Sequence, residues 1–539
     1  MDSIVVVVVV RQTVPVDQGT EGEQTAATTS VGRPDVPAGS GREHPHDDAR
    51  PHDGARQQTA ARPATRAAAV LRAAVRGPVV HWPVTLLTLV AFGAYLTLSL
   101  ARWHRWENPS WDNAIFEQAV AGYARLGAPV VPIKGPDFNQ LGDHFSPLLV
   151  VLAPFYRAFP SPVTLLVAQC VLVAVSVVPI TLVARRLLGA WPGLAVGFAY
   201  AFAWGIQSAV DVQFHEYSLA VPILAFGMAA FLTERWRASA VWVVLLLGVK
   251  EDLGLTVAAF GVVLWLRGQR RLGTIVAAVG AAGFVLVLTV IVPFFNPHGR
   301  YDYWGKLSED GAAASSGSTV SGLLDTAAGL LTPAVKIETL VMLAVITALV
   351  ALRSPLALVA VPTLVWRFAG STEFYWGTTW HYSVILMPIL FAAAIDGILQ
   401  LRRSRSELLR TYARLAPAAM AVVAAVLVTQ FPLRDLWSPA TYERSERVAA
   451  AERAVAAVPA GSSVASDRGL IVQLATDREV YWISTDPTVR PDYVVIDQLS
   501  WGGNAPLDVE QYAERAFPGT TYTVVADEDG YVVVERTAG

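Results

Sequence analysis

Long apolar stretches alternate with short polar ones between residues 84 and 430, and this alternation is the dominant pattern of the chain. A helix needs about 20 apolar residues to cross the hydrocarbon core of a membrane. The pattern predicts about eleven transmembrane helices. Their expected ranges are 84–101, 162–184, 191–208, 218–233, 239–250, 253–266, 273–293, 335–352, 354–369, 381–400 and 413–430. Because several are short, we expect the pair around Lys250 to be tilted, broken or partly re-entrant.

The composition supports a polytopic membrane protein. Of 539 residues, 53% are hydrophobic and only 16% are charged, and the mean hydropathy is +0.43. These values are far from those of a soluble protein of this length. The net charge of -3 gives no basic excess, so a nucleic acid is not an expected partner. The single cysteine, Cys170, lies in an apolar stretch and is expected to be a small buried hydrophobic residue.

The two ends of the chain differ from this middle part. Residues 1–80 are expected to be a disordered cytoplasmic tail, because the polar stretch within them has no apolar periodicity. Residues 81–432 are the expected transmembrane domain. Residues 433–539 show a predicted helix, "ATYERSERVAAAERAVAAVP", followed by short apolar runs and a hairpin pattern, "DEDGYVVVE". This pattern predicts a small extracytoplasmic α/β domain.

The arginines give the orientation of the expected helices. Basic clusters at 72–76, 185–186, 235–237, 267–271 and 402–410 all fall on one side when the predicted helices alternate in direction. Short loops rich in Lys and Arg stay in the cytoplasm. We therefore expect a multi-pass protein of the cell membrane with a cytoplasmic N-terminus. The long loop 102–161 and the C-terminal domain would then lie outside the cytoplasm.

Ionisable residues collect on the outer side of this arrangement. The short polar segments 211–218, 250–252, 296–304 and 366–382 fall there together with loop 102–161. Charged groups near the apolar layer are unfavourable by several kcal/mol unless they are paired or hydrated. Their collection at one level predicts a shared hydrated cavity, and a functional site is the first hypothesis for it.

Two aspartates are the candidate catalytic residues, Asp112 and Asp143. Asp112 starts a predicted amphipathic helix, where the helix dipole and a cap by Ser110 would equally explain an acidic residue. The apolar stripe of that helix is expected to lie at the membrane surface and consists of Trp111, Ile115, Phe116 and Val120. Asp143, in "GDHFSP", lies in a predicted turn before the apolar segment 147–158, and pairing with His144 is its simpler explanation.

Ten further residues are candidates for substrate binding: Glu117, His144, His215, Glu216, Lys250, Glu251, Asp252, Arg300, Trp380 and His381. A salt bridge such as Lys250 to Glu216 explains the charged pairs as well as a ligand does. Arg300 suits a phosphate, although a solvated arginine is the commoner case. The aromatic residues around Trp380 fit either a sugar face or the interfacial belt. A divalent cation, Mg²⁺ or Mn²⁺, stays an open alternative, because no metal-ligand spacing is present.

Four segments carry a resemblance to a known family: "WDNAIFEQAVAGYARLG", "GDHFSPLLVVLAPFYRAFPSPVTLLVAQ", "FHEYSLAVP" and "KEDLGL". They resemble a family of bacterial predicted membrane proteins of unknown function, grouped with the GT-C superfamily of integral-membrane glycosyltransferases. The resemblance implies a multi-helix core, an essential acidic residue in the first outer loop and a polyprenyl-phosphate-linked sugar as donor. Asp112 matches that acidic residue best and Asp143 second. The chain departs from the superfamily because its adjacent acids in "KED" replace an Asp-x-Asp or Glu-x-Asp pair.

The predicted fold is therefore an all-α, GT-C-like membrane protein with a small C-terminal α/β domain. The predicted function is transfer of a sugar from a polyprenyl-phosphate-linked donor, reached through the lipid bilayer, to an extracytoplasmic acceptor. Two other classes stay open. A transporter or lipid flippase would also cluster a few charges, but at mid-membrane and with an internal repeat. A non-enzymatic membrane protein would leave the outer charge clusters unexplained.

Overall fold

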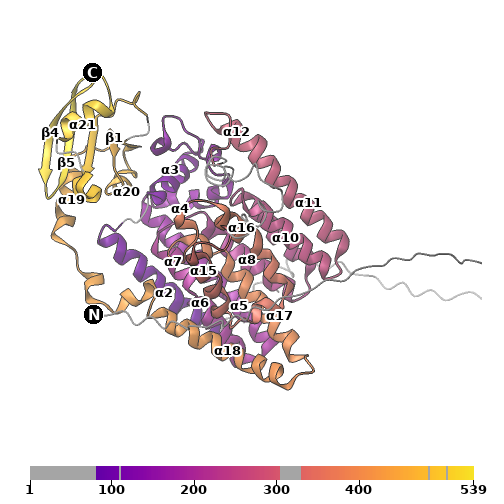
Figure 1. Ribbon diagram of the computed structural model, residues 1–539. Helices are drawn as coiled ribbons and strands as arrows, with labels where there is room; N and C mark the ends of the chain where they lie inside the picture. Colours follow the sequence, from indigo (N-terminus) through magenta and orange to yellow (C-terminus); the bar gives the residue numbers. More distant parts are fainter. Residues whose placement is uncertain (1–80, 108–110, 304–328, 484–485, 505–507) are drawn as a thin grey trace, which may run out of the picture. The chain divides into compact units, whose positions relative to one another are not determined.

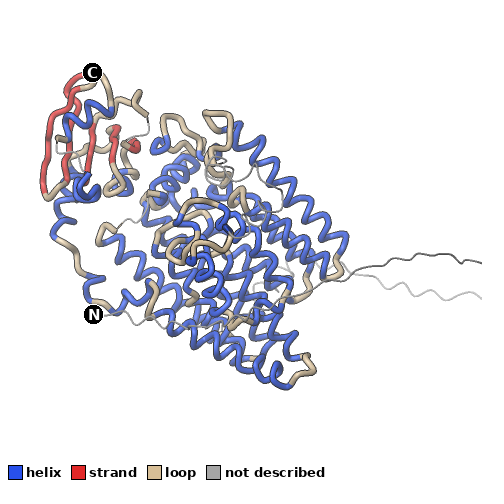
Figure 2. Tube along the Cα trace, in the orientation of Figure 1, coloured by secondary structure: helices blue, strands red, loops and turns tan. Residues whose placement is uncertain are grey.

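The structure is a computed structural model that describes residues 81–107, 111–303, 329–483, 486–504 and 508–539. Helices predominate among the described residues before residue 460, and the strands of the described residues all belong to the C-terminal part of the chain (Figures 1 and 2). The predicted N-terminal tail and Ser110, the expected cap, lie outside the described residues.

Six helical segments among the described residues are long and apolar enough to cross a membrane. Three of them are single helices: α2 (Trp82–His104), α5 (Pro162–Leu188) and α18 (Glu407–Val428). The other three are composite. Ala190–Asp211 contains α6 (Ala190–Ala201) and α7 (Trp204–Asp211); Arg270–Phe295 contains α11 (Arg270–Leu286), η5 (Val287–Ile291) and α12 (Val292–Phe295); and His381–Arg402 contains η9 (His381–Ser383) and α17 (Leu386–Arg402). The chain is thus a multi-pass membrane protein.

Other helices are too short to cross a membrane alone. Two of the shorter apolar ones are single helices, α8 (Tyr217–Leu232) and α10 (Leu253–Leu266). Three are composite: Pro147–Ala158 contains η3 (Pro147–Leu152) and α4 (Ala153–Ala158), Trp236–Gly248 contains α9 (Trp236–Val244) and η4 (Leu245–Gly248), and Pro355–Ala369 contains η7 (Pro355–Ala360) and α16 (Val361–Ala369). Two more are α3 (Asp112–Ala124) and α15 (Ala334–Ile346). The expected count of eleven transmembrane helices therefore stays a prediction.

Two expected helices differ from the structure for local reasons. The predicted helix 191–208 is interrupted between α6 and α7, where Ala203 has an extended backbone (φ -61°, ψ 139°). The predicted helix 335–352 ends early, because Ala348 and Leu349 take left-handed backbone angles, φ 46° and 57°. Non-glycine residues rarely adopt these angles, and they turn the chain.

Helix α5 begins and ends where its sequence indicates. The Ser161 side chain accepts a hydrogen bond from the Val163 amide, and Pro162 occupies the first turn, where its missing N–H is no loss. Gly189 ends the helix with φ 106°. Cys170 is fully buried within it, as the sequence predicts.

Helices α10 and α11 pack closely through glycines. A Cβ atom on Gly261 would lie 2.3 Å from the Ala277 amide nitrogen, and one on Gly280 would lie 2.5 Å from that of Ala258. Small residues let membrane helices approach each other to backbone contact. Most residues of α11 are not buried in the protein, so this helix presents a large surface to lipid.

The C-terminal part contains a five-stranded sheet in the order β2-β1-β3-β5-β4. The strands are β1 (Ser463–Ser466), β2 (Glu479–Trp482), β3 (Tyr493–Asp497), β4 (Thr521–Glu528) and β5 (Tyr531–Ala538), and the helices are α19 (Glu446–Ala456), α20 (Ile471–Leu474) and α21 (Val509–Ala516). Strand β1 pairs in parallel with β2 and β3, whereas β5 is antiparallel to β3 and β4.

The predicted hairpin is confirmed as β4 and β5. Asp529 and Gly530 both have positive φ, 51° and 82°, which matches the two-residue turn favoured between twisted strands. The predicted helix at the start of this domain is also present as α19. The C-terminal part of the chain therefore contains the small sheet and helices that the sequence predicts, whereas its status as a separate domain stays a prediction.

Candidate functional site

A cavity of about 260 Å³ collects polar side chains from distant parts of the chain. It lies where α3, the starts of α8 and α10, and the segments after α12 and α16 meet. Its lining comprises Asp112, Phe116, His144, His215, Glu216, Lys250, Glu251, Asp252, Leu255, Phe284, Leu288, Tyr301, Tyr303, Trp366, Gly370, Tyr375, His381 and Tyr382. The structure thus brings eight of the twelve predicted site residues to one cavity.

Asp112 and His215 form the most accessible polar pair of the cavity. Asp112 Oδ2 lies 3.2 Å from His215 Nε2, and the Asp112 side chain is 33% exposed. His215 Nδ1 lies 3.2 Å from the carbonyl oxygen of Gln213. A carboxylate and a carbonyl can only accept hydrogen bonds, so both contacts are satisfied together when both ring nitrogens carry a proton. The His215 ring thus holds the Asp112 carboxylate at the cavity.

His381 stacks on His215 with 3.6 Å between the ring centroids. Its ring is buried, and its Nδ1 has no hydrogen-bond partner among the described residues. Phe116 also packs against His215, edge to face, with 6.0 Å between centroids. The two rings fix the plane of His215, and with it the direction in which Asp112 is held.

Lys250 pairs with Glu216 on the wall of the cavity. Lys250 Nζ lies 2.6 Å from Glu216 Oε1 and 4.6 Å from the centre of the Tyr217 ring. The sequence raised this salt bridge as one explanation of the two charged clusters, and the structure contains it. Glu216 is almost completely buried, so removing either partner would leave an uncompensated charge in the interior.

Glu251 ties the turn before α10 to loop 102–161. Its Oε1 lies 2.8 Å from His144 Nδ1, and its Oε2 accepts a hydrogen bond from the Phe145 amide at 3.1 Å. The Tyr301 hydroxyl donates to Oε1 at 3.2 Å. Glu251 therefore fixes two outer segments that are distant from it in sequence.

Asp252 faces the opposite way from Glu251. Both of its carboxylate oxygens accept from the Tyr217 hydroxyl at 3.0 Å, and Oδ2 also accepts from Trp366 Nε1 at 3.1 Å. The adjacent acids of "KED" thus connect to different walls of the cavity.

Asp143 lies behind the cavity wall and holds the loop. Its carboxylate accepts from the Tyr303 hydroxyl at 3.1 Å and pairs with Lys134 at 3.1 Å. Burial acts to raise the pKa of Asp143, but His144 and Lys134 outweigh it and hold that pKa below its ordinary value. Asp143 stays ionised, and its nearest cations are already in contact with it. Its contacts therefore suit a structural carboxylate.

His144 stands between the two acids. Burial and the charge of Lys250 act to lower its pKa, but the carboxylates of Glu251 and Asp143 outweigh them, and its pKa is raised. The ring also stacks on Tyr303 with 4.7 Å between centroids. His144 thus carries positive charge at a higher pH than a free histidine would.

Arg367 organises the aromatic segment that closes the cavity. The guanidinium is fully buried and donates to the carbonyl oxygens of Tyr375 and Gly377 at 2.7 and 3.2 Å, and to the Ser383 hydroxyl at 3.1 Å. These bonds hold the ends of the 375–383 segment together. Tyr375 and Tyr382, which line the cavity, pack edge to face at 4.9 Å within it.

Three other predicted residues lie away from the cavity. Glu117 is completely buried on the side of α3 that contacts the C-terminal domain, where Thr476 donates to it at 2.9 Å. The Arg300 side chain is 73% exposed and pairs with Asp302 at 3.0 Å. Trp380 packs against Phe374. The structure therefore groups none of these three with Asp112.

The stripe expected at the membrane surface is buried in the protein. Ile115, Phe116 and Val120 are at most 4% exposed, and the Trp111 ring lies 4.4 Å from that of Trp482 in the C-terminal domain. The surface position expected for this helix face was wrong, because other parts of the same chain cover it. An apolar stripe alone does not distinguish a lipid neighbour from a protein neighbour.

The sequence prediction did not select the tyrosines and Lys134. Tyr301 and Tyr303 lie in the polar segment 296–304, and Tyr375 and Tyr382 lie in 366–382, so their positions on the outer side were visible in the sequence. Lys134 had no signal beyond its place in the long loop. Among the described residues no group of three or more His, Cys, Asp and Glu side chains is arranged to hold a metal ion. The acids point to separate partners, so no step is assigned here to a divalent cation.

Comparison with known proteins gives one family and several solved structures. A family model described as "Predicted membrane protein (DUF2079)" matches residues 107–533. No curated protein matches the chain. ArnT from Cupriavidus metallidurans bound to undecaprenyl phosphate is 14% identical, with a TM-score of 0.49, and the match covers 84% of this chain and 97% of that one.

Two further structures are similar at the same distant level. The apo state of the same ArnT is 14% identical, with a TM-score of 0.47, over 86% of this chain and 98% of that one. The Archaeoglobus fulgidus oligosaccharyltransferase in complex with Zn and sulfate is 12% identical, with a TM-score of 0.43, over 83% of this chain and 72% of that one.

Proposed function

The chain belongs to the family of predicted membrane proteins DUF2079, and we propose that it transfers a sugar from a polyprenyl-phosphate-linked donor to an acceptor hydroxyl on the outer side of the membrane. The observation that carries this proposal is the Asp112–His215 pair in a cavity that also contains a lysine. The pair supplies an accessible carboxylate, and Lys250 supplies a cation for a phosphate.

The reaction needs two bond changes at the anomeric carbon of the sugar. The bond from this carbon to the donor phosphate breaks, and a bond to the acceptor oxygen forms. Asp112 takes the proton of the acceptor hydroxyl, and the polyprenyl phosphate leaves as an anion. A positioned general base contributes a rate factor on the order of 10² to 10⁴. His215 is a positioning residue, because its ring holds the Asp112 carboxylate at 3.2 Å.

Lys250 is the proposed contact for the departing phosphate. Its ammonium is held by Glu216 at 2.6 Å and keeps further donor capacity, since an ammonium has three N–H groups. Fixed cations in a desolvated site stabilise charge that develops on a leaving group. Arg300, the other cation proposed from the sequence, is exposed and paired with Asp302, so it does not share this role.

The apolar side of the cavity suits a lipid-linked donor. Leu255 of α10 and Phe284 and Leu288 of the α11 segment line it. The same segment continues into the π-helical turn Val287–Ile291 and presents most of its residues to lipid. A donor whose phosphate lies near Lys250 can therefore extend its prenyl chain past these side chains into the bilayer.

The orientation follows from the arginine pattern. We place residues 1–80 in the cytoplasm, 81–432 in the membrane, and 433–539 outside the cytoplasm with the cavity. The C-terminal domain supports the site from behind: Gln118 of α3 donates to the Val480 carbonyl oxygen at 3.1 Å, next to the contact between Trp111 and Trp482. These contacts hold the helix that carries Asp112.

The test compares the wild type with Asp112→Asn in membranes supplied with a labelled polyprenyl-phosphate sugar. We expect transfer to fall by a factor on the order of 10² to 10⁴. Asp137→Asn is the matched control, because Asp137 is exposed in the same loop and its φ of 53° is tolerated by asparagine. Equal transfer in both variants would remove Asp112 from the mechanism. Movement of the donor across the membrane without transfer would favour the transporter.

A further inference from the structure

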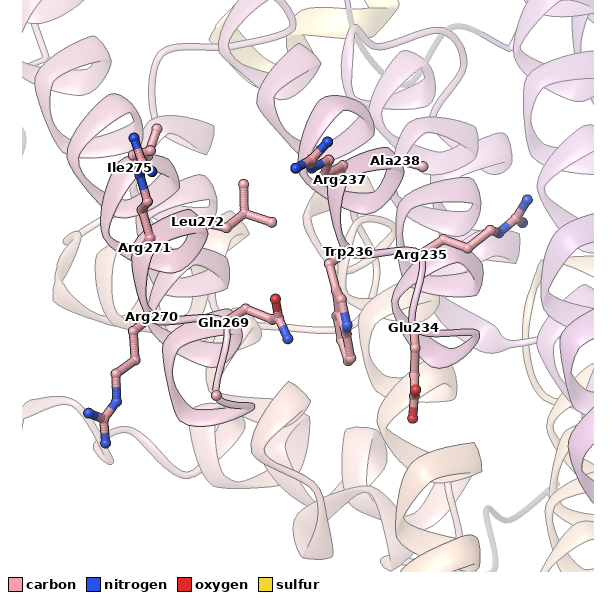
Figure 3. A pocket seen from close by; sticks show the side chains of 11 residues that line it. Glu234, Arg235, Trp236, Arg237, Ala238, Gln269, Arg270, Arg271, Leu272 and Ile275 are labelled. Atoms are coloured by element: carbon pink, nitrogen blue, oxygen red, sulfur yellow. The ribbon is translucent and has the colours of Figure 1, made fainter. Parts of the chain in front are cut away.

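A second, larger hollow lies at the other end of the short helices. This groove, of about 1010 Å³, is formed by the turn between α8 and α9 and the turn between α10 and α11 (Figure 3). The segment Trp236–Gly248 starts at the groove and ends beside Lys250. At 1.5 Å per helical residue, the groove and the candidate site are about 20 Å apart along this segment.

The groove is strongly basic. Arg235 and Arg237 come from one wall and Arg270 and Arg271 from the other, against a single acid, Glu234. Within the described ranges none of these arginines forms an ion pair with a carboxylate: Arg235 contacts a threonine hydroxyl, and Arg270 lies over a tryptophan ring. The groove therefore carries uncompensated positive charge and favours an anion.

The side chains leave the groove open between its two walls. In Figure 3, Gln269 and Leu272 point across the gap toward Trp236 and Arg237, while Glu234 points outward, away from the opposite wall. Arg235 and Arg270 point away from the gap, so an anion between the walls would first meet the Arg237 guanidinium and the Gln269 amide. Arginines bind phosphate oxygens through paired N–H groups.

An apolar slot continues directly from the groove. It has a volume of about 270 Å³ and shares Arg235 and Ala238 with the groove. Its lining is mostly apolar and includes Leu182 of α5, Phe226 of α8 and Trp242 of α9, with Arg186 and Thr233 as further polar members. A third hollow, of about 300 Å³, shares Leu182 with the slot and continues along α2. A charged head region thus joins a long apolar track. The positive-inside rule accounts for the arginines but gives no reason for this track.

The short helices place the groove at the depth of lipid head groups. Helix α10 has 14 residues and the segment Trp236–Gly248 has 13, both fewer than the about 20 needed to cross the hydrocarbon core. Their arginine end therefore meets the bilayer at or below the level of the lipid phosphates. Trp265 and Ile275 beside it are 47% and 51% exposed, as expected for contact with lipid.

We propose that this groove binds the phosphate head group of an anionic phospholipid, with one acyl chain lying in the apolar slot. The cytoplasmic leaflet is rich in anionic lipids that attract basic segments, and the arginine pattern places the groove there. The lipid would fill the space left by the short helices and brace α8 and α9 against α10 and α11. This inference does not depend on the proposed transfer reaction.

The experiment measures lipid binding to the full-length purified protein by native mass spectrometry, titrated with phosphatidylglycerol or phosphatidylcholine. The double variant Arg237→Gln with Arg271→Gln is expected to weaken phosphatidylglycerol binding by about tenfold. The matched control is Arg403→Gln with Arg405→Gln, which removes the same charge from exposed positions after α17. Its binding is expected to stay within about twofold of the wild type.

Two further measurements distinguish binding of a lipid from binding of a simple anion. Inorganic phosphate in excess is expected to leave most of the phosphatidylglycerol bound, because it cannot replace the acyl chain. Ala238→Trp, at the exposed junction of groove and slot, is expected to weaken lipid binding with all arginines present. Equal affinity for the two lipids, full displacement by phosphate, or unchanged binding in both the double variant and Ala238→Trp would overturn the proposal.

Discussion

Glu117 gives the chain a stability that depends on pH. Its carboxylate is completely buried, Oε1 accepts hydrogen bonds from Tyr156 at 2.8 Å and Thr476 at 2.9 Å, and Oε2 has no partner within the described residues. Burial raises the pKa of Glu117 from 4.5 to about 8, although the two hydrogen bonds act to lower it. At neutral pH the folded protein therefore keeps this group protonated.

The sign and size of the effect follow from this raised pKa. The folded state binds the proton more tightly than the unfolded state, so the stabilisation is fully present below pH 4.5 and is lost as pH rises through about 8. One pH unit between the two pKa values corresponds to about 1.4 kcal/mol. Over the whole window the free energy of unfolding should fall by roughly 5 kcal/mol on this account.

Glu117→Gln removes the titration and keeps the shape of the side chain. We expect thermal unfolding of the purified protein in detergent to show a midpoint that falls between about pH 5 and about pH 8 in the wild type and falls less in the variant. The variant should be the more stable of the two at the upper end. Glu443→Gln, at an exposed position, is the control and should follow the wild type. A variant with the same pH slope as the wild type would refute a protonated Glu117.

Three other predictions concern the site. Lys250→Met should lower the free energy of unfolding by about 3–5 kcal/mol, because it leaves Glu216 buried without its cation, and adding Glu216→Gln should recover much of the loss in thermal unfolding. Gly142→Ala should lower the free energy of unfolding by about 1–3 kcal/mol and should also lower sugar transfer, because its Cβ would lie 2.5 Å from the backbone at the end of α12. Gly93→Ala is the control and should change neither, because the space around Gly93 is open. Arg367→Lys should reduce transfer and stability together, because a lysine cannot make the three divergent hydrogen bonds of the guanidinium, and an unchanged melting temperature would contradict this.

The sequence predicted which segments meet, because alternation of apolar blocks fixes which side of the membrane each loop faces. Asp112, His215, Lys250 and His381 are separated by many helices, yet all four line one cavity. Which of these side chains contact each other could not be predicted from the sequence. Whether Lys250 meets Glu216 or a ligand depends on side-chain positions that periodicity does not contain, so the sequence left both alternatives open.

The position of Glu117 follows in part from helix geometry. Residues four apart lie on one helix face, which places Phe116 with Asp112 in the cavity. Glu117 follows Asp112 by five positions, which is about 140° around the helix, and so it faces away. What it faces, Thr476 of the C-terminal domain, could not be read from the pattern, because that contact joins residues 359 positions apart.

The charge of the cavity lining constrains any phosphate that enters it. In the described residues the lining holds four carboxylates, Asp112, Glu216, Glu251 and Asp252, and one fixed cation, Lys250. A phosphate donor would be repelled by this balance unless further positive charge lies beside Lys250. His144 is the lining histidine suited to add such a charge, because the carboxylates of Glu251 and Asp143 raise its pKa. Histidines can take up or release a proton as the anion enters and leaves, whereas arginines at the same positions would hold the departing lipid phosphate permanently. The preference for histidine over arginine in this cavity is therefore consistent with a site that has to release an anionic product.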